Sequence, residues 1–222
     1  MADILLVHGL WNRGWSMTAM AKRLRARGHH VVVFSYPTRS DCLEGHADEL
    51  HAFIEAIHTK KSGTKKGGDE VNGAEELHLV GHSMGGLVIL KMFSRYNDMP
   101  AGRIVLMGTP VKGSGVVKRL GKLPGQKFIF GKAREDLLQG FQHTPYGHET
   151  GMIRGTRALG LGQIAGRQAE PNDGSVCVSE TELDGLKDSI ELEVAHSEML
   201  VSMEVVEQLE HFLLYGEFAK VI

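Results

Sequence analysis

A serine with a glycine two residues before it and another two residues after it is the clearest sign of chemistry in this chain. The segment Gly81-x-Ser83-x-Gly85 follows an apolar run with strand character and precedes a run with helical character. This arrangement exposes a serine hydroxyl on a sharp strand-to-helix turn. The glycines matter because a Cβ atom at either position would clash where the strand and helix backbones come close. The motif predicts that Ser83 is a nucleophile, and the alternative is a glycine-rich turn capped by a serine.

Two residues farther along the chain could activate this serine. A serine hydroxyl needs an adjacent base at neutral pH, and imidazole is well matched to that task. His196 follows a late apolar run, and Asp173 lies in a Pro-Asn-Asp-Gly segment. A carboxylate holds the imidazole in the right tautomer and stabilises its charged form. We therefore predict Ser83 as nucleophile, His196 as base and Asp173 as orienting acid. Three acids compete with Asp173 for this role, namely Glu170, Asp184 and Asp188.

Acyl transfer to such a serine would also need N–H groups that face the negative charge that develops during the reaction. Acyl transfer passes through a tetrahedral intermediate whose oxyanion requires preorganised donors. The backbone N–H of Met84 directly follows the nucleophile and can supply one donor. We expect the second from Leu10, because Gly9 lets the backbone turn after the first strand-like run.

Alternating strand-like and helix-like segments must position these residues. Apolar runs predict strands over 4–7, 31–34, 77–80, 104–107, 158–165 and 190–194. The 3.6-residue period predicts helices over 15–27, 43–60, 85–96 and 204–215, the first with Trp15, Met20 and Leu24 on one apolar side. Such alternation implies a parallel sheet covered on both faces. Ligands of such sheets bind beyond the carboxyl ends of the strands, and the chemically useful residues here each follow a strand.

Residues 111–157 break this rhythm. They are rich in Gly, Lys and isolated apolar side chains, and we interpret them as a cap-like insertion with short helices after the fourth strand. The insertion would lie above the site and would line an acyl pocket. Candidate substrate-binding residues are Trp11, Phe128 and Phe141.

Composition limits the remaining possibilities. The 222 residues suit one domain, 1–222, and the net charge of −2 does not favour nucleic acid or an anionic membrane surface. Cys42 and Cys177 lack metal-ligand spacing and are expected to be buried or half-buried thiols rather than a disulfide. The first apolar run is too short for a signal peptide, and no run is long enough for a transmembrane segment, so a cytoplasmic protein is expected.

The chain resembles the α/β-hydrolase superfamily, and within it the small bacterial lipases and esterases. The matching segments are His8-Gly9-Leu10-Trp11, the residues 81–86, Gly108-Thr109-Pro110, Asn172-Asp173-Gly174 and His196. The resemblance implies a minimal α/β-hydrolase fold of about six mainly parallel strands that begins at the family's third strand. It assigns the catalytic and oxyanion roles to the five residues named above and implies no metal and no organic cofactor.

The function that this resemblance implies is hydrolysis of a small-molecule carboxylic ester through an acyl-enzyme. A thioesterase, an amidase or an acyltransferase could use the same three residues, because pocket shape decides among them. The alternative from another class is a catalytically silent hydrolase fold that binds a ligand or a protein.

Overall fold

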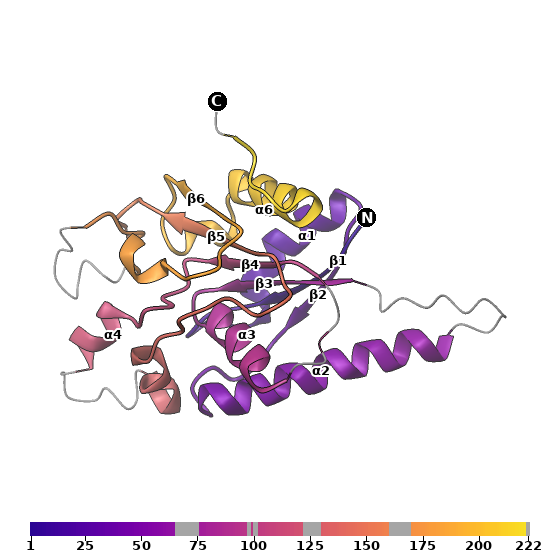
Figure 1. Ribbon diagram of the computed structural model, residues 1–222, viewed down its shortest axis with the longest axis horizontal. Helices are drawn as coiled ribbons and strands as arrows, with labels where there is room; N and C mark the ends of the chain where they lie inside the picture. Colours follow the sequence, from indigo (N-terminus) through magenta and orange to yellow (C-terminus); the bar gives the residue numbers. More distant parts are fainter. Residues whose placement is uncertain (65–75, 97–98, 100–101, 122–129, 160–169, 221–222) are drawn as a thin grey trace.

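A single parallel sheet organises the chain. The computed structural model describes residues 1–64, 76–96, 99, 102–121, 130–159 and 170–220. Six strands pair in parallel in the order β2-β1-β3-β4-β5-β6 (Figure 1). They are β1 (Asp3–Val7), β2 (His30–Phe34), β3 (Leu77–His82), β4 (Ile104–Met107), β5 (Thr150–Gly155) and β6 (Asp188–Leu192). β3 and β4 are buried along their whole length, as expected for central strands covered on both faces.

The sequence placed five of the six strands correctly and misplaced the fifth. β5 lies within the segment predicted as an insertion, whereas Ala158 and Leu159 form no strand and residues 160–165 lie outside the described residues. Glycines at two positions of β5 hid its pattern. A Cβ on Gly151 would come within 2.7 Å of the Phe212 ring, and one on Gly155 would meet the backbone carbonyl of Val194. Close packing therefore requires glycine where strand propensity disfavours it.

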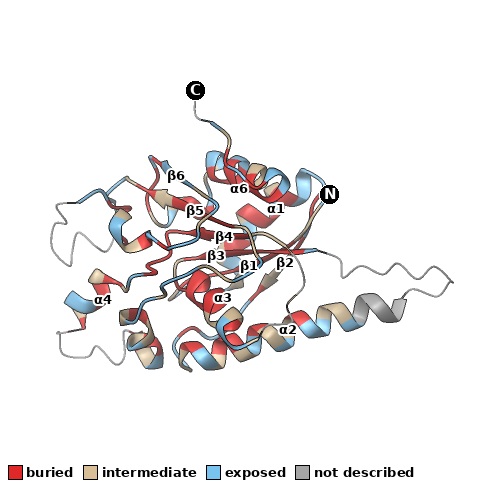
Figure 2. Cartoon of the chain, viewed as in Figure 1, coloured by how far each residue is buried: buried red, intermediate tan, exposed pale blue. Residues whose placement is uncertain are grey.

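Two pairs of helices cover the faces of the sheet. α1 (Thr18–Ala26) and α6 (Met203–Tyr215) lie on one face, and α2 (Leu43–Thr64) and α3 (Met84–Arg95) lie on the other (Figure 1). Buried residues fill both layers between helices and sheet (Figure 2). The expected start of the first helix is instead the short 3-10 helix η1 (Gly14–Met17). Trp15 is 74% exposed there, so its predicted place on the apolar side is wrong.

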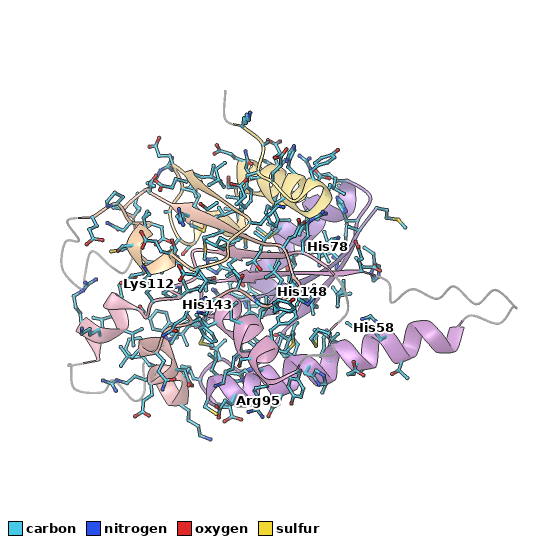
Figure 3. All side chains as sticks on the ribbon, in the orientation of Figure 1. His58, His78, Arg95, Lys112, His143 and His148 are labelled. Atoms are coloured by element: carbon cyan, nitrogen blue, oxygen red, sulfur yellow. The ribbon has the colours of Figure 1, made fainter. Side chains whose placement is uncertain are left out.

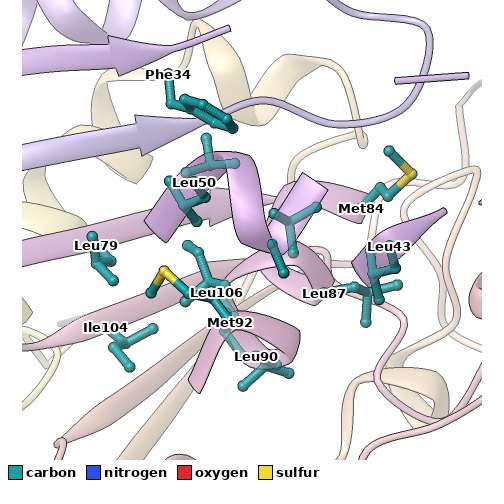
Figure 4. Close-up of a cluster of buried hydrophobic side chains, with 14 of the residues drawn as sticks. Phe34, Leu43, Leu50, Leu79, Met84, Leu87, Leu90, Met92, Ile104 and Leu106 are labelled. Carbon is teal, nitrogen blue, oxygen red and sulfur yellow. The ribbon is translucent and has the colours of Figure 1, made fainter. Parts of the chain in front are cut away.

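The core beneath α3 holds the serine turn in place. Leu43 and Leu50 of α2 pack with Met84 and Leu87 of α3 against Leu106 in the sheet (Figure 4). Each of these side chains is at most 2% exposed. Burying a side chain of this size stabilises the fold by about 1.5–3 kcal/mol, so the start of α3 is firmly anchored.

The segment between β4 and β5 carries short helices and emerges where the strands end. It contains α4 (Gly115–Leu120), η2 (Gly131–Arg134) and η3 (Asp136–Leu138). The Ser114 side chain accepts a hydrogen bond from Val117 N–H and so caps α4. Two further 3-10 helices, η5 (Val178–Thr181) and η6 (Glu198–Leu200), flank β6. Across the described ranges, no helix combines the length and the apolar character needed to cross a membrane.

Candidate active site

Ser83 occupies a strained turn between β3 and α3. Its φ of 55° and ψ of −125° are unusual for a residue with a side chain, and the surrounding structure must hold them. The Ser83 N–H donates to the Met107 carbonyl at 2.8 Å. A Cβ on Gly81 would come within 2.5 Å of Gly86 Cα, and one on Gly85 would overlap the Val7 carbonyl. The predicted strand–turn–helix geometry and its need for glycine are therefore present.

The strain leaves the serine hydroxyl available. Ser83 stands at the N-cap position of α3, yet its side chain makes no capping hydrogen bond. A serine at this position commonly accepts a hydrogen bond from the first turn of the helix. Here the backbone directs the hydroxyl away from that role, and Ser83 lines a pocket instead.

Asp173 and His196 form a directly bonded pair. Asp173 Oδ2 lies 2.6 Å from His196 Nδ1, and the carboxylate is only 1% exposed. The other oxygen, Oδ1, accepts hydrogen bonds from the N–H groups of Ser175 and Val176 at 2.9 and 2.7 Å. The His196 backbone N–H donates to the Asp173 carbonyl at 2.8 Å. These contacts leave His196 Nε2 as the ring nitrogen that can face a substrate.

The rival acids have other partners. Glu170 accepts a hydrogen bond from the Ser179 hydroxyl, and Asp188 accepts one from Phe218 N–H at 2.8 Å. The Asp184 backbone pairs with the segment around His143. None of these three carboxylates is bonded to His196, whose acid partner among the described residues is Asp173.

Ser83 and His196 line one pocket of about 250 Å³. The structure shows no hydrogen bond between their side chains among the described residues, and catalytic contacts of this kind often tighten only when substrate is bound. The loop after β1 closes the pocket beside the serine. A Cβ on Gly9 would come within 2.8 Å of Ser83 Cβ, so the next residue, Leu10, lies beside Ser83 and also lines the pocket.

The loop that carries Leu10 is held by the loop after β2. The Tyr36 hydroxyl donates to the His8 carbonyl at 2.8 Å, and the two rings stack at 4.6 Å. Trp11 N–H donates to Thr38 Oγ1 at 3.2 Å, and Trp11 adopts a φ of 60°. These contacts fix the backbone on both sides of Leu10, which is what a preorganised N–H donor requires.

The cap-like segment supplies much of the pocket wall. Phe130, Leu137, Val116 and Val117 line the pocket, and Phe130 is fully buried with its ring 5.9 Å from Trp11. The wall is completed from outside the segment by Pro110, Leu159 and Val176.

The candidate substrate-binding residues have three different outcomes. Trp11 lines the pocket. Phe128 lies outside the described residues. Phe141 does not line the pocket but packs half-buried against the core, so its predicted place in the pocket is wrong. Sequence reasoning missed Val116 and Val117 in the pocket wall, although these apolar residues at the start of a serine-capped helix are a signal that could have found them.

The sequence matches the Alpha/beta hydrolase family over residues 4–170. The chain belongs to this family. It is 33% identical over 100 residues to a carbendazim hydrolyzing esterase of Nocardioides sp. (strain SG-4G). Those residues are 43% of this chain and 37% of that protein, so the match spans little more than a third of the relative's length.

Solved structures share the α/β-hydrolase fold with this chain. A mature lipase, BlEst2 of Bacillus licheniformis, superposes with a TM-score of 0.75 at 17% identity, covering 96% of this chain and 91% of the lipase. A pyrethroid hydrolase of Sphingobium faniae JZ-2 superposes with a TM-score of 0.58 at 14% identity, covering 96% and 98%. At these identities the likeness concerns the fold.

A second histidine supports the site of this α/β hydrolase. His82 directly precedes Ser83. Its Nε2 lies 3.0 Å from the His196 carbonyl oxygen, and the two rings are 4.6 Å apart. Its side chain is 1% exposed, and burial lowers its pKa to about 3. The ring is therefore neutral and must donate through Nε2–H, because a carbonyl oxygen can only accept. His82 thus fixes the backbone of His196.

Proposed function

We propose that this α/β hydrolase is a serine hydrolase that cleaves carboxylic esters through an acyl-enzyme intermediate. The observation that carries the proposal is the Asp173–His196 pair at 2.6 Å, which faces the same pocket as a serine on a strained, uncapped turn. The names of the esterase, lipase and pyrethroid hydrolase above point in the same direction.

The proposed reaction proceeds in two halves. His196 Nε2 takes the proton of Ser83 Oγ as that oxygen bonds to the ester carbonyl carbon. The N–H groups of Leu10 and Met84 stabilise the oxyanion. Met84 is the first residue of α3, so the positive end of the helix dipole also favours the negative charge there. His196 returns the proton to the leaving alcohol as the C–O bond breaks. In the second half, His196 takes a proton from a water molecule as the water oxygen bonds to the acyl carbon. His196 then returns this proton to Ser83 Oγ as the acyl–Ser83 bond breaks and the acid leaves. Asp173 stabilises the imidazolium in both halves.

The pocket supports a small-molecule ester as the substrate. Its volume of about 250 Å³ lies just below the usual range for drug-sized ligands, roughly 300–1,000 Å³. We propose that the segment after β4, within one domain over 1–222, acts as the cap that selects the acyl group. A cytoplasmic location stays a prediction from the sequence.

Substitution of the nucleophile tests the proposal. Ser83→Ala should lower kcat on p-nitrophenyl esters by about three to six orders of magnitude, because the hydroxyl that forms the acyl-enzyme in the proposed reaction is removed. Circular dichroism should show that the fold is retained. Hydrolysis that survives this substitution would rule out Ser83 as the nucleophile.

Covalent labelling separates the enzyme from a silent fold. A fluorophosphonate probe should label the wild-type chain on Ser83 and should not label Ser83→Ala. A panel of p-nitrophenyl esters, acyl-thioesters and anilides of graded length should give the highest kcat/KM with the oxygen esters. If the wild-type chain is neither labelled nor active on this panel, the chain is a binding protein rather than an enzyme.

A further inference from the structure

A second and larger cleft adjoins the catalytic pocket. Its volume is about 960 Å³, and it is lined by the loop after β1, the loop after β2 and Gly131. Trp11 and Asn12 line both this cleft and the pocket that holds Ser83. The two spaces are therefore neighbours that meet at Trp11 and Asn12.

The loops around the cleft are fixed to one another. Gly14 N–H donates to Ser35 Oγ at 3.0 Å, beside the bond from Trp11 N–H to Thr38 Oγ1. On the other side, Lys132 N–H donates to the Arg39 carbonyl at 3.4 Å. Such cross-links between segments far apart in sequence preorganise a surface, and preorganisation lowers the entropic cost of binding.

The lining of the cleft is cationic. Arg13 and Arg39 contribute guanidinium groups, Asn12 and Ser40 contribute neutral polar side chains, and no carboxylate is found among the described lining residues. An ion pair beside the cleft joins Lys132 and Asp41 at 3.8 Å. The whole chain has a net charge of −2, so the positive character belongs to the cleft and not to the molecule. A guanidinium binds carboxylate and phosphate oxygens with two parallel hydrogen bonds.

We propose that this arginine cleft binds the anionic end of the substrate, a carboxylate or phosphate group carried by an ester whose carbonyl carbon lies at Ser83. The inference rests on the proposed ester hydrolysis and adds a substrate class to it, namely anionic esters in preference to neutral esters of equal length. The anionic end undergoes no bond change. It orients the ester and raises its occupancy in the catalytic pocket.

Matched ester pairs test this preference from both sides of the scissile bond. On the acyl side, the pair is the mono-p-nitrophenyl ester of glutarate and p-nitrophenyl pentanoate. On the alcohol side, it is the butanoyl ester of 4-hydroxybutanoate and butyl butanoate. We expect the anionic member of at least one pair to have a kcat/KM about tenfold higher, and added NaCl should reduce that ratio by screening.

Neutral variants of the two arginines test whether the preference for anionic esters arises in this cleft. Arg13→Gln and Arg39→Gln should each lower the anionic-to-neutral ratio of kcat/KM about fivefold or more, in line with loss of a charge-assisted hydrogen bond. Lys22→Gln is the charge-matched control, because Lys22 is exposed on α1 and does not line the cleft. The control should keep the wild-type ratio.

A binding measurement makes the test independent of turnover. The chain has two tryptophans, so Trp15→Phe leaves Trp11 as its single tryptophan reporter. Glutarate and inorganic phosphate should each be titrated, and a saturable change in Trp11 fluorescence is expected with at least one, weakened by Arg13→Gln. The anion that responds identifies the carboxylate or the phosphate as the preferred group.

The outcomes separate the two proposals. The chain could hydrolyse neutral esters, show an anionic-to-neutral ratio of kcat/KM near one in both pairs, and show no saturable change in Trp11 fluorescence. This result would overturn the arginine cleft and leave ester hydrolysis intact. No hydrolysis of any ester, with saturable anion binding lost in Arg13→Gln, would overturn the proposed hydrolysis and retain the cleft as an anion site.

Discussion

Both carboxylate oxygens of Asp173 are engaged before any substrate binds. Oδ1 accepts two backbone N–H groups, and Oδ2 faces His196 Nδ1 at 2.6 Å. The acid is thus held in one orientation, and its Oδ2 accepts a hydrogen bond from His196 Nδ1–H. That leaves His196 Nε2 without a proton, which is the tautomer a general base needs.

Asp173→Asn should therefore lower kcat by about 10³–10⁴-fold. An amide can donate to Nδ1, which shifts the ring proton to Nε2 and removes the base. The measurement is kcat on p-nitrophenyl acetate. The control is Glu170→Gln, which removes a rival acid that is bonded to Ser179 and should change kcat less than about threefold. A large loss in Glu170→Gln with activity retained in Asp173→Asn would transfer the role to Glu170.

At the scale of elements, the cap-like segment determines the shape of the pocket. α4 brings Val116 and Val117 to the wall, and the turns around η2 and η3 bring Phe130 and Leu137. All four are buried, so the wall is packed rather than open. A packed apolar wall favours acyl chains that fill the pocket and rejects longer ones, because overpacking is as unfavourable as an empty cavity.

The chain-length profile of hydrolysis should follow this wall. Each buried methylene contributes about 0.8 kcal/mol, so kcat/KM should rise about fourfold per methylene until the pocket is full. Leu137→Ala should move the optimum to acyl chains longer by one or two methylenes and leave acetyl ester hydrolysis within a few fold. The measurement is kcat/KM across p-nitrophenyl esters from acetate to decanoate.

Phe141→Ala is the matched control for this profile. Phe141 comes from the same segment but packs against the core rather than the pocket. Its removal should lower stability and keep the optimum unchanged. If Phe141→Ala shifts the optimum and Leu137→Ala does not, the acyl pocket lies elsewhere.

At the scale of the whole molecule, the strand order explains where the site lies. The strand order reverses direction between β1 and β3. β2 lies beside β1 toward one edge of the sheet, and β3 to β6 follow in order toward the other edge. The crevice at such a switch point is where parallel sheets bind ligands. The loop with Leu10 follows β1, and Ser83 follows β3, so both lie at this crevice. His8 and His82 are buried beside this crevice, and His78 is buried near the start of β3; burial lowers the pKa of each of these imidazoles.

Because of these buried imidazoles, the free energy of unfolding should begin to fall at a pH well above the range in which carboxylates titrate. His82 titrates near 6.5 when unfolded and near 3 when folded, so its contribution is complete above pH 6.5 and is lost as the pH falls toward 3. From His82 alone, the free energy of unfolding should fall by about 2 kcal/mol between pH 7.5 and pH 5. Urea unfolding at both pH values measures it.

His82→Gln should reduce that pH dependence, because glutamine can still donate to the His196 carbonyl but does not titrate. His143→Gln is the control, since His143, whose side chain is labelled in Figure 3, is exposed and is not one of the buried imidazoles. The control should show the wild-type slope. A His82→Gln slope equal to that of the wild type would mean that other groups cause the acid sensitivity.

Local sequence patterns determined much of this protein. The elbow around Ser83 was readable because glycine is required within a few residues of it, and most strands were readable because apolar runs are local. Tertiary structure alone decided three features. β5 was hidden because the Phe212 ring demands glycine at Gly151. Phe141 turned out to pack against the core because the path of its segment, not its composition, decides what it faces. The arginine cleft joins Arg13 to Arg39 across two loops. Such contacts between distant segments depend on how the chain packs, and no local pattern records them.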